Sequence, residues 1–127
     1  MIDVHNIILN KKDTVLKALE LLDLYALRIV LVVDENNHLL GSITDGDIRR
    51  GLLKGQDLNA SVETIMHGSP YSIEEGTLNN RQIFEIMREK RYLALPVIKN
   101  EQLVNIITLD DLIQKKRKEN SCIPGSL

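Results

Sequence analysis

Thr44 and Asp47 are residues whose types and spacing suggest binding chemistry. They lie in the stretch LLGSITDGDIRR, where an apolar segment ends and a charged, helix-compatible run begins. A threonine at such a junction can cap the helix, while the free backbone N–H groups and the positive end of the helix dipole attract an anion such as phosphate. The carboxylate of Asp47 can accept hydrogen bonds from hydroxyl groups. This junction therefore predicts a site for an anionic ligand that also carries hydroxyls.

The same junction occurs again later in the chain. Thr108 and Asp111, in LVNIITLDDL, stand 64 residues after Thr44 and Asp47. A single Thr-x-x-Asp motif could be only a capping box, in which the residue at the third position reaches back to the cap. Two equally spaced copies, each after an apolar strand, indicate an internal duplication with binding-site geometry. Both interpretations can hold together, because a capped helix still has N–H groups that an anion can reach.

Hydrophobic periodicity predicts the elements that position the first junction. Within residues 1–58 the pattern indicates the order β-α-β-β-α, with strands at 7–9, 29–33 and 39–43 and helices at about 14–26 and 45–54. Asp13 or Thr14 is the expected cap of the first helix, and Gly55 is placed to end the second one.

The second repeat, residues 59–118, is expected to follow the same order after a short helix at 62–66. Its strands should begin at Pro70, Leu93 and Leu103, and its helices should follow Thr77 and run from 109 to about 118. Units of this size are marginally stable alone. We therefore predict an α/β (α+β) fold in which the two repeats pack face to face around a pseudo-twofold axis and share one core.

Composition argues against several kinds of partner. Sixteen basic and eighteen acidic residues give a net charge of −2, without the basic excess that nucleic-acid binding uses. The longest apolar runs, such as 29–33, are too short to cross a membrane, and the N-terminus has no signal-peptide pattern. We predict a cytoplasmic protein that binds neither nucleic acid nor membrane. Cys122 is the only cysteine, so an intrachain disulfide and a cysteine-based zinc site are excluded.

No metal site or catalytic group is predicted. The three histidines, His5, His38 and His67, are scattered without ligand spacing, and the sequence Asp45-Gly46-Asp47 lacks the further ligands of a calcium loop. No nucleophile–base pair and no Gly-rich phosphate loop accompanies the acidic residues. We expect no required cofactor, and the chain could still be part of a larger enzyme.

The duplicated pattern resembles a tandem pair of CBS domains, the Bateman module, over residues 1 to about 118. The resemblance rests on the strand near Pro70–Tyr71, the Leu95–Pro96–Val97 strand and the G-h-h-T-x-x-D junction. It implies that the threonine and the helix start bind the phosphate of an adenine nucleotide, that the aspartate binds the ribose hydroxyls, and that apolar residues of the first and middle strands hold the base. Asn105 departs from this pattern, because Gly41 holds its place in the first repeat.

Eight residues are nucleotide-binding candidates on these grounds. Tyr71 could stack on adenine or line the core, and Ile7 is its counterpart in the first repeat. Arg28 and Arg49 are the phosphate candidates, since the fold should place them near the junction. The full set is Thr44, Asp47, Thr108, Asp111, Tyr71, Ile7, Arg28 and Arg49.

Within the family, the stretch from Ala26 to Gly55 resembles the N-terminal CBS pair of bacterial sugar-phosphate nucleotidyltransferases. The resemblance implies a regulatory fragment that senses an adenine nucleotide for an attached transferase domain, followed by a tail at 119–127 without a repeat counterpart. The alternative is a structural dimerisation module that binds no ligand. Either way we expect a homodimer, because the chain has more apolar helix positions than one small core needs: Leu16, Leu24, Leu52, Leu53 and Ile113.

Overall fold

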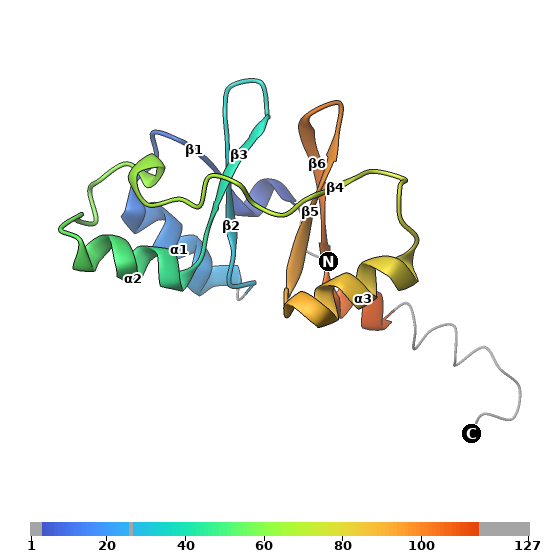
Figure 1. The fold of residues 1–127 in the computed structure, drawn as a ribbon. Helices are drawn as coiled ribbons and strands as arrows, with labels where there is room; N and C mark the ends of the chain where they lie inside the picture. Colours follow the sequence, from blue (N-terminus) through green and yellow to red (C-terminus); the bar gives the residue numbers. More distant parts are fainter. Residues whose placement is uncertain (1–3, 26, 115–127) are drawn as a thin grey trace, which may run out of the picture.

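The computed structural model describes residues 4–25 and 27–114 as two similar units joined by a long connection (Figure 1). The first unit contains η1 (Val4–Ile7), β1 (Ile8–Asn10), α1 (Val15–Tyr25), β2 (Val30–Val33), β3 (Leu39–Ile43) and α2 (Asp45–Leu53). The connection contains η2 (Val62–Thr64). The second unit contains β4 (Ile73–Glu74), α3 (Asn80–Lys90), β5 (Ala94–Lys99), β6 (Gln102–Thr108) and a helical segment at 109–114.

Strand pairing confirms the duplication. Each unit has a three-stranded sheet, in the orders β1-β2-β3 and β4-β5-β6, with one parallel and one antiparallel pair. Leu9 pairs with Val32 in the first sheet, and Ile73 pairs with Val97 at the equivalent place in the second. The antiparallel register shifts directly after Val32 in one sheet and directly after Val97 in the other. The fold is therefore the predicted α+β arrangement of two repeats.

The hairpin turn of the second repeat is one residue shorter than that of the first. In the shorter turn, Asn100 and Glu101 both have positive φ, 53° and 68°, as a two-residue type I′ turn requires. The longer turn is organised by Asp34, whose carboxylate accepts the backbone N–H groups of Asn36 and His38. The His38 N–H, more than any other contact, holds the pKa of Asp34 below its usual value, and the His38 imidazole and the Asn36 N–H lower it further.

Local capping determines where the helices begin. Thr14 accepts the N–H of Lys17, so the expected cap of α1 is confirmed. α3 begins at Asn80 rather than directly after Thr77, because Asn79 and Gln82 form a reciprocal capping box at that point. Gly55, with φ of 100°, follows the last turn of α2 as expected.

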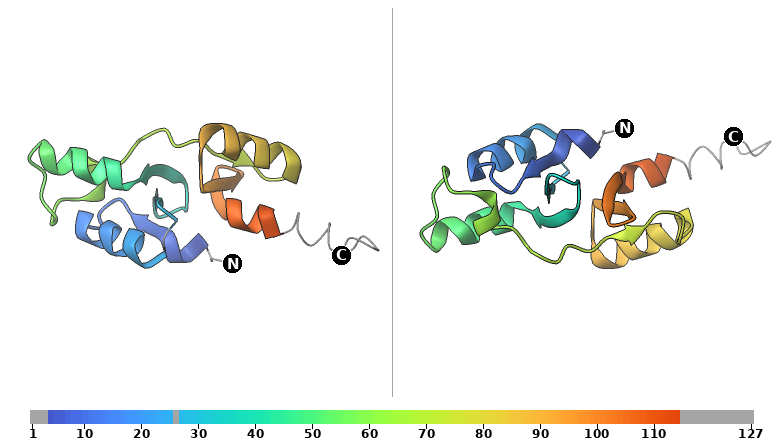
Figure 2. Two further views of the ribbon diagram at one scale, coloured as in Figure 1. Left: turned by 90° about the horizontal axis from the view of Figure 1, so that it is seen from below. Right: turned by 90° about the horizontal axis from the view of Figure 1, so that it is seen from above.

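Within residues 4–25 and 27–114 the buried apolar side chains form three clusters, whereas the sequence predicted one core shared by the repeats. One lies within the first repeat and one within the second, each between a sheet and its helices. The third lies between the sheets and is built from both repeats: Val4, Ile7, Leu31, Val33, Ala94, Leu103 and Ile106. Figure 2 shows this arrangement, with the sheets facing each other in the middle and the helices at the outer ends.

Hydrogen bonds at the hairpin tips also join the repeats. The backbone N–H of Leu103 donates to Asn37 O at 2.9 Å, and the side-chain amide of Asn37 donates back to Leu103 O. The amide of Gln102 donates to Asn36 O at 2.9 Å. The two hairpins therefore stand side by side as one bonded unit (Figure 1).

The connection between the repeats is bound to the first repeat along its length. Val62 is fully buried in the core of that repeat, although the sequence division at residue 58 assigned it to the second one. Further on, His67 exchanges backbone hydrogen bonds with Ser42 on β3, at 3.0 and 2.8 Å. Residues 69–71 follow directly and enter the second repeat, so the connection links the edge of one sheet to the start of the other.

The first strand of each repeat begins later than the sequence predicted, at Ile8 instead of Ile7 in the first repeat. Val4 and Ile7 form a 3-10 turn because their three-residue spacing lets both side chains enter the cluster between the sheets. In the second repeat β4 begins at Ile73, not at Pro70. The end of the last helix near 118, Ala26, and the tail at 119–127 with Cys122 lie outside the described residues.

Candidate functional site

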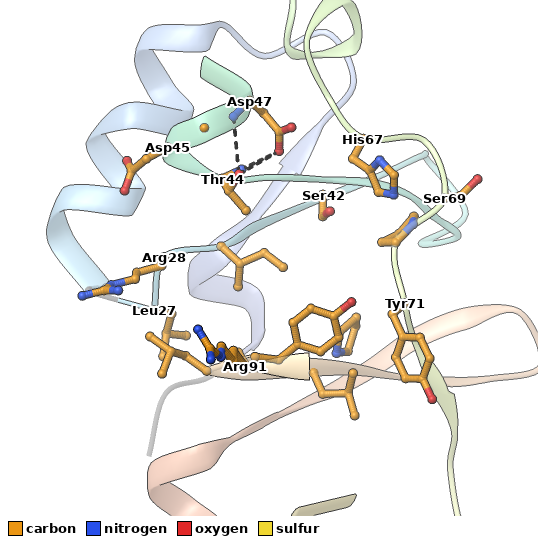
Figure 3. Close-up of a pocket in the computed structure, with 18 of the residues that line it drawn as sticks. Leu27, Arg28, Ser42, Thr44, Asp45, Asp47, His67, Ser69, Tyr71 and Arg91 are labelled. Carbon is orange, nitrogen blue, oxygen red and sulfur yellow. Dashed lines mark hydrogen bonds between the residues drawn. The ribbon is translucent and has the colours of Figure 1, made fainter. Parts of the chain in front are cut away.

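A cleft of about 740 Å³ lies between the two repeats (Figure 3). This volume is in the range of small-molecule sites, roughly 300–1,000 Å³. The first repeat contributes residues 27–29, the end of β3 and the start of α2, and the second contributes residues 91–96. The connection supplies the last side: His67, Ser69, Pro70 and Tyr71.

Thr44 and Asp47 form one wall of the cleft. The backbone N–H and the hydroxyl of Thr44 both donate to Oδ2 of Asp47, at 2.9 and 3.0 Å, while Thr44 Oγ1 accepts the N–H of Asp47 at 3.4 Å. This is a capping box at the N-terminus of α2, and the same two side chains line the cleft. The capping and binding interpretations therefore apply to the same residues.

Arginine side chains give the cleft positive groups. Arg28, Arg50 and Arg91 all line it, alongside the carboxylates of Asp45 and Asp47. Arg50 forms an ion pair with Asp47, Nη2 to Oδ1 at 2.8 Å. Arg28 and Arg91 have positive φ, 63° and 60°, in the turns that lead into β2 and β5. These arginines suit the cleft to an anionic ligand.

The sequence prediction chose Arg49 where the structure places Arg50. Arg49 is exposed on α2 and does not line the cleft. Helix geometry explains the difference, because residues three apart share a face whereas residues two apart do not. The three-residue spacing from Asp47 to Arg50 was the available signal. Arg91 carried no such signal.

Aromatic rings lie at another part of the cleft. Tyr71 and Tyr92 both line it, with ring centroids 6.0 Å apart and planes tilted by 43°. The ammonium group of Lys90 lies 5.1 Å from the centre of the Tyr71 ring. In Figure 3 Tyr71 and Arg28 stand at opposite sides of the cavity. The sequence points to Tyr71 but not to Tyr92, which occupies an otherwise ordinary position after a helix.

Besides Arg49, three further candidate residues lie away from this cleft. Ile7, the counterpart of Tyr71, is fully buried between the sheets. Thr108 is 5% exposed, and its hydroxyl accepts the N–H of Asp111 at 3.0 Å. Neither Thr108 nor Asp111 lines the cleft. The structure thus brings together Thr44, Asp47, Tyr71 and Arg28, and leaves Ile7, Arg49, Thr108 and Asp111 outside.

Within the described ranges, 4–25 and 27–114, no three His, Cys, Asp or Glu side chains gather as a metal ion would require. Across those same ranges, every helix is too short or too polar to span a bilayer.

Comparisons with known proteins place these features in a family. The profile of the CBS domain matches residues 2–54 and again 62–118. Inosine-5'-monophosphate dehydrogenase of Aquifex aeolicus is 29% identical over 114 residues, which are 88% of this chain and 23% of that protein. The chain thus spans about a quarter of the length of this relative.

Solved structures share the fold. CBSX2 in complex with AMP has a TM-score of 0.77 at 22% identity, covering 94% of each chain. The CBS domains of a transcriptional regulator from Streptococcus pneumoniae have a TM-score of 0.74 at 19% identity, covering 89% of this chain and 92% of that one. Because the CBS domain profile matches both repeats, this chain belongs to the CBS domain family.

Proposed function

We propose that the cleft between the repeats binds an adenine nucleotide. The observation that carries the proposal is the placement of aromatic rings and arginines in one cavity. The Tyr71 and Tyr92 rings can contact a base, while Arg28, Arg50, Arg91 and the N-terminus of α2 can bind phosphate. The likeness to CBSX2, whose structure contains AMP, supports this choice of ligand.

The proposed role of binding is regulatory. Residues from both repeats and from the connection line the cleft, so a ligand would contact parts of the chain that are far apart in sequence. A ligand changes a conformational equilibrium only when it binds one arrangement better than another. We propose that occupancy is transmitted to an attached catalytic domain, and the sequence resemblance described above favours a sugar-phosphate nucleotidyltransferase in that role.

Adding AMP is expected to raise the melting temperature of the purified chain. A ligand bound only by the folded state stabilises it by about 2.7 kcal/mol at a hundredfold excess over the dissociation constant. The measurement is a thermal unfolding series with AMP, ADP, ATP and a nucleotide sugar. An unchanged melting temperature with all four ligands would contradict the proposal.

The duplicated junctions provide matched variants for this measurement. Asp47→Ala should weaken AMP binding by about 1.5–3 kcal/mol, the range for a hydrogen bond to a charged group. Asp111→Ala removes the equivalent carboxylate outside the cleft, so its AMP affinity should equal that of the unmodified chain. Equal losses in both variants would argue against this cleft as the binding site.

A second function, self-association, is favoured by the helices of the first repeat. α1 and α2 expose the large apolar side chains of Leu16, Leu19, Leu24, Leu52 and Leu53. By contrast, α3 exposes charged residues such as Arg81, Glu85 and Arg88. Ile113, also expected on this surface, is half-buried. We propose a homodimer through the α1–α2 face, as symmetric dimers are the commonest oligomers.

Light scattering of the unmodified chain at micromolar concentration should give twice the mass of one chain. Leu24 and Leu53, 69% and 81% exposed, can be changed to lysine without opening a core cavity. The Leu24→Lys/Leu53→Lys variant is expected to have the monomer mass of 14.4 kDa. Arg81→Glu, on the charged face of α3, is the control and should stay dimeric. A monomer mass for the unmodified chain across a hundredfold concentration range would contradict the dimer.

A further inference from the structure

The contact between the two hairpin tips depends on one side chain, that of Asn37. Its backbone oxygen accepts the N–H of Leu103 at 2.9 Å, and its side-chain amide donates to the carbonyl oxygen of the same residue. Both backbone polar groups of Leu103 are thus bonded to the other repeat. Because Leu103 is 2% exposed and belongs to the apolar cluster between the sheets, water has little access to these groups.

The turn of the first hairpin presents Asn37 for this contact. Asn37 has φ of 64°, in the left-handed region, and its N–H donates to Asp34 O at 3.0 Å. Asparagine is one of the few residues besides glycine that adopt this backbone conformation at low cost. Residue 37 therefore needs a left-handed backbone and a side-chain donor together, and asparagine supplies both.

Asn100, in the turn of the second hairpin, provides a comparison. It also has positive φ, 53°, and it is exposed. Within residues 4–25 and 27–114, however, no hydrogen bond joins its side chain to the other repeat. The two asparagines share a backbone conformation and differ in their contacts, so a left-handed turn residue does not by itself explain the amide at residue 37.

The tips and the cleft lie at opposite ends of the same strands (Figure 1). β3 begins beside the first tip at Leu39 and ends at Ile43, next to Thr44, which lines the cleft. β5 begins in the cleft with Ala94 and ends beside the second tip with Lys99. At about 3.3 Å per residue, the six residues of β5 span roughly 20 Å. A rotation of one repeat at the tips is therefore carried along the strands to the walls of the cleft.

The apolar cluster between the sheets does not fix this rotation by itself. Hydrophobic contact is non-directional, so apolar side chains can pack in more than one relative orientation of the sheets. In coiled coils a single polar residue in an apolar seam sets the register of the helices. Asn37 has the corresponding position here, because its half-buried amide bonds one particular carbonyl group at the margin of the cluster.

We propose that Asn37 is a positioning residue for the cleft: by bonding Leu103 it fixes the orientation of the repeats in which both walls contact the ligand. This inference rests on the nucleotide function proposed above and adds a residue that acts from the far end of the sheets. Only the bonded orientation binds with full affinity, so the apparent dissociation constant rises as the bonded fraction falls. By linkage, a bound ligand stabilises the bonds between the tips.

Calorimetry of the full chain with AMP tests the role of the amide. Asn37→Gly keeps the left-handed backbone and removes the amide, so AMP affinity should fall about twofold to tenfold. Asn37→Asp also tolerates this backbone, yet its carboxylate would face the carbonyl oxygen of Leu103, and the loss should be larger than for glycine. Asn100→Gly and Asn100→Asp are the matched controls and should bind AMP like the unmodified chain.

Amide hydrogen exchange measured by NMR tests the linkage. The N–H of Leu103 should exchange faster in Asn37→Asp, and saturating AMP should slow its exchange in the unmodified chain although it lies outside the cleft. The N–H of Glu75, bonded to Ile98 O within the second repeat, is the control and should keep its rate.

Three results would overturn this inference and leave nucleotide binding intact. They are unchanged AMP affinity in both Asn37 variants, equal losses in the Asn37 and Asn100 variants, and AMP binding that leaves Leu103 exchange unchanged or slows Glu75 equally. Failure of the unmodified chain to bind AMP would overturn the proposed function and this inference together.

Discussion

Leu31→Ala is expected to destabilise the chain by about 2–5 kcal/mol, the range for removing a large buried aliphatic side chain. Leu31 is fully buried in the cluster between the two sheets, where it packs with residues of both repeats. The resulting cavity would weaken the contact that each small repeat needs for its stability. The measurement is urea unfolding followed by circular dichroism, with the free energy of unfolding extrapolated to water.

Arg81→Ala is the control for this substitution, because the Arg81 side chain is 88% exposed on α3, away from the proposed dimer face. Its free energy of unfolding should stay within about 0.5 kcal/mol of the original value, as for most surface substitutions. A loss below 1 kcal/mol in Leu31→Ala, or similar losses in both variants, would contradict the role of the cluster between the sheets.

Gly41→Ala is expected to lower both stability and nucleotide affinity. A Cβ atom at Gly41 would lie 2.8 Å from the carbonyl oxygen of His67 and 2.7 Å from the sulfur of Met66. The connection would have to move away from β3, where Ser42 and His67 exchange hydrogen bonds. Overpacking of this kind costs about 1–3 kcal/mol. AMP affinity should also fall, because the displaced segment continues into Tyr71.

Gly68→Ala provides the control for Gly41→Ala. Gly68 lies on the same connection, but nothing stands within 4 Å of a Cβ atom built there. Unfolding and AMP titration of the two variants should therefore differ clearly. If Gly41→Ala unfolded and bound AMP like Gly68→Ala, the connection would not depend on close contact with β3.

A comparison with Asn105 shows why glycine is required at residue 41 but not at the equivalent position of the second repeat. Asn105 lies opposite Val97 of β5, just as Gly41 lies opposite Val32 of β2, so the two positions are equivalent. Asn105 is exposed, and its side-chain oxygen accepts the N–H of Ile106 at 2.8 Å. The strand position itself thus accepts a side chain, and it is the passing connection that excludes one at Gly41. The sequence alone shows that Gly41 and Asn105 differ, but it does not show that the connection is the reason.

Local signals explain most of what could be predicted. Alternating and helical periodicity reflects which side chains face the core, and caps such as Thr14 and Thr44 act within one helical turn. The predicted bounds of β3, 39–43, are the observed ones for this reason. The first strands were predicted less well, since Ile7 and Tyr71 take their places from contacts between repeats.

By itself the sequence determined the duplication, the β-α-β-β-α order of each repeat and the two Thr-x-x-Asp junctions, because these depend on interactions between residues close in the chain. Only the tertiary structure decided which junction lines the cleft. Packing between the repeats buries Ile7 while its counterpart Tyr71 faces the cavity, and it brings Arg91 and Tyr92 to the junction at Thr44. That outcome depends on how segments more than 40 residues apart fit together, which no local pattern records.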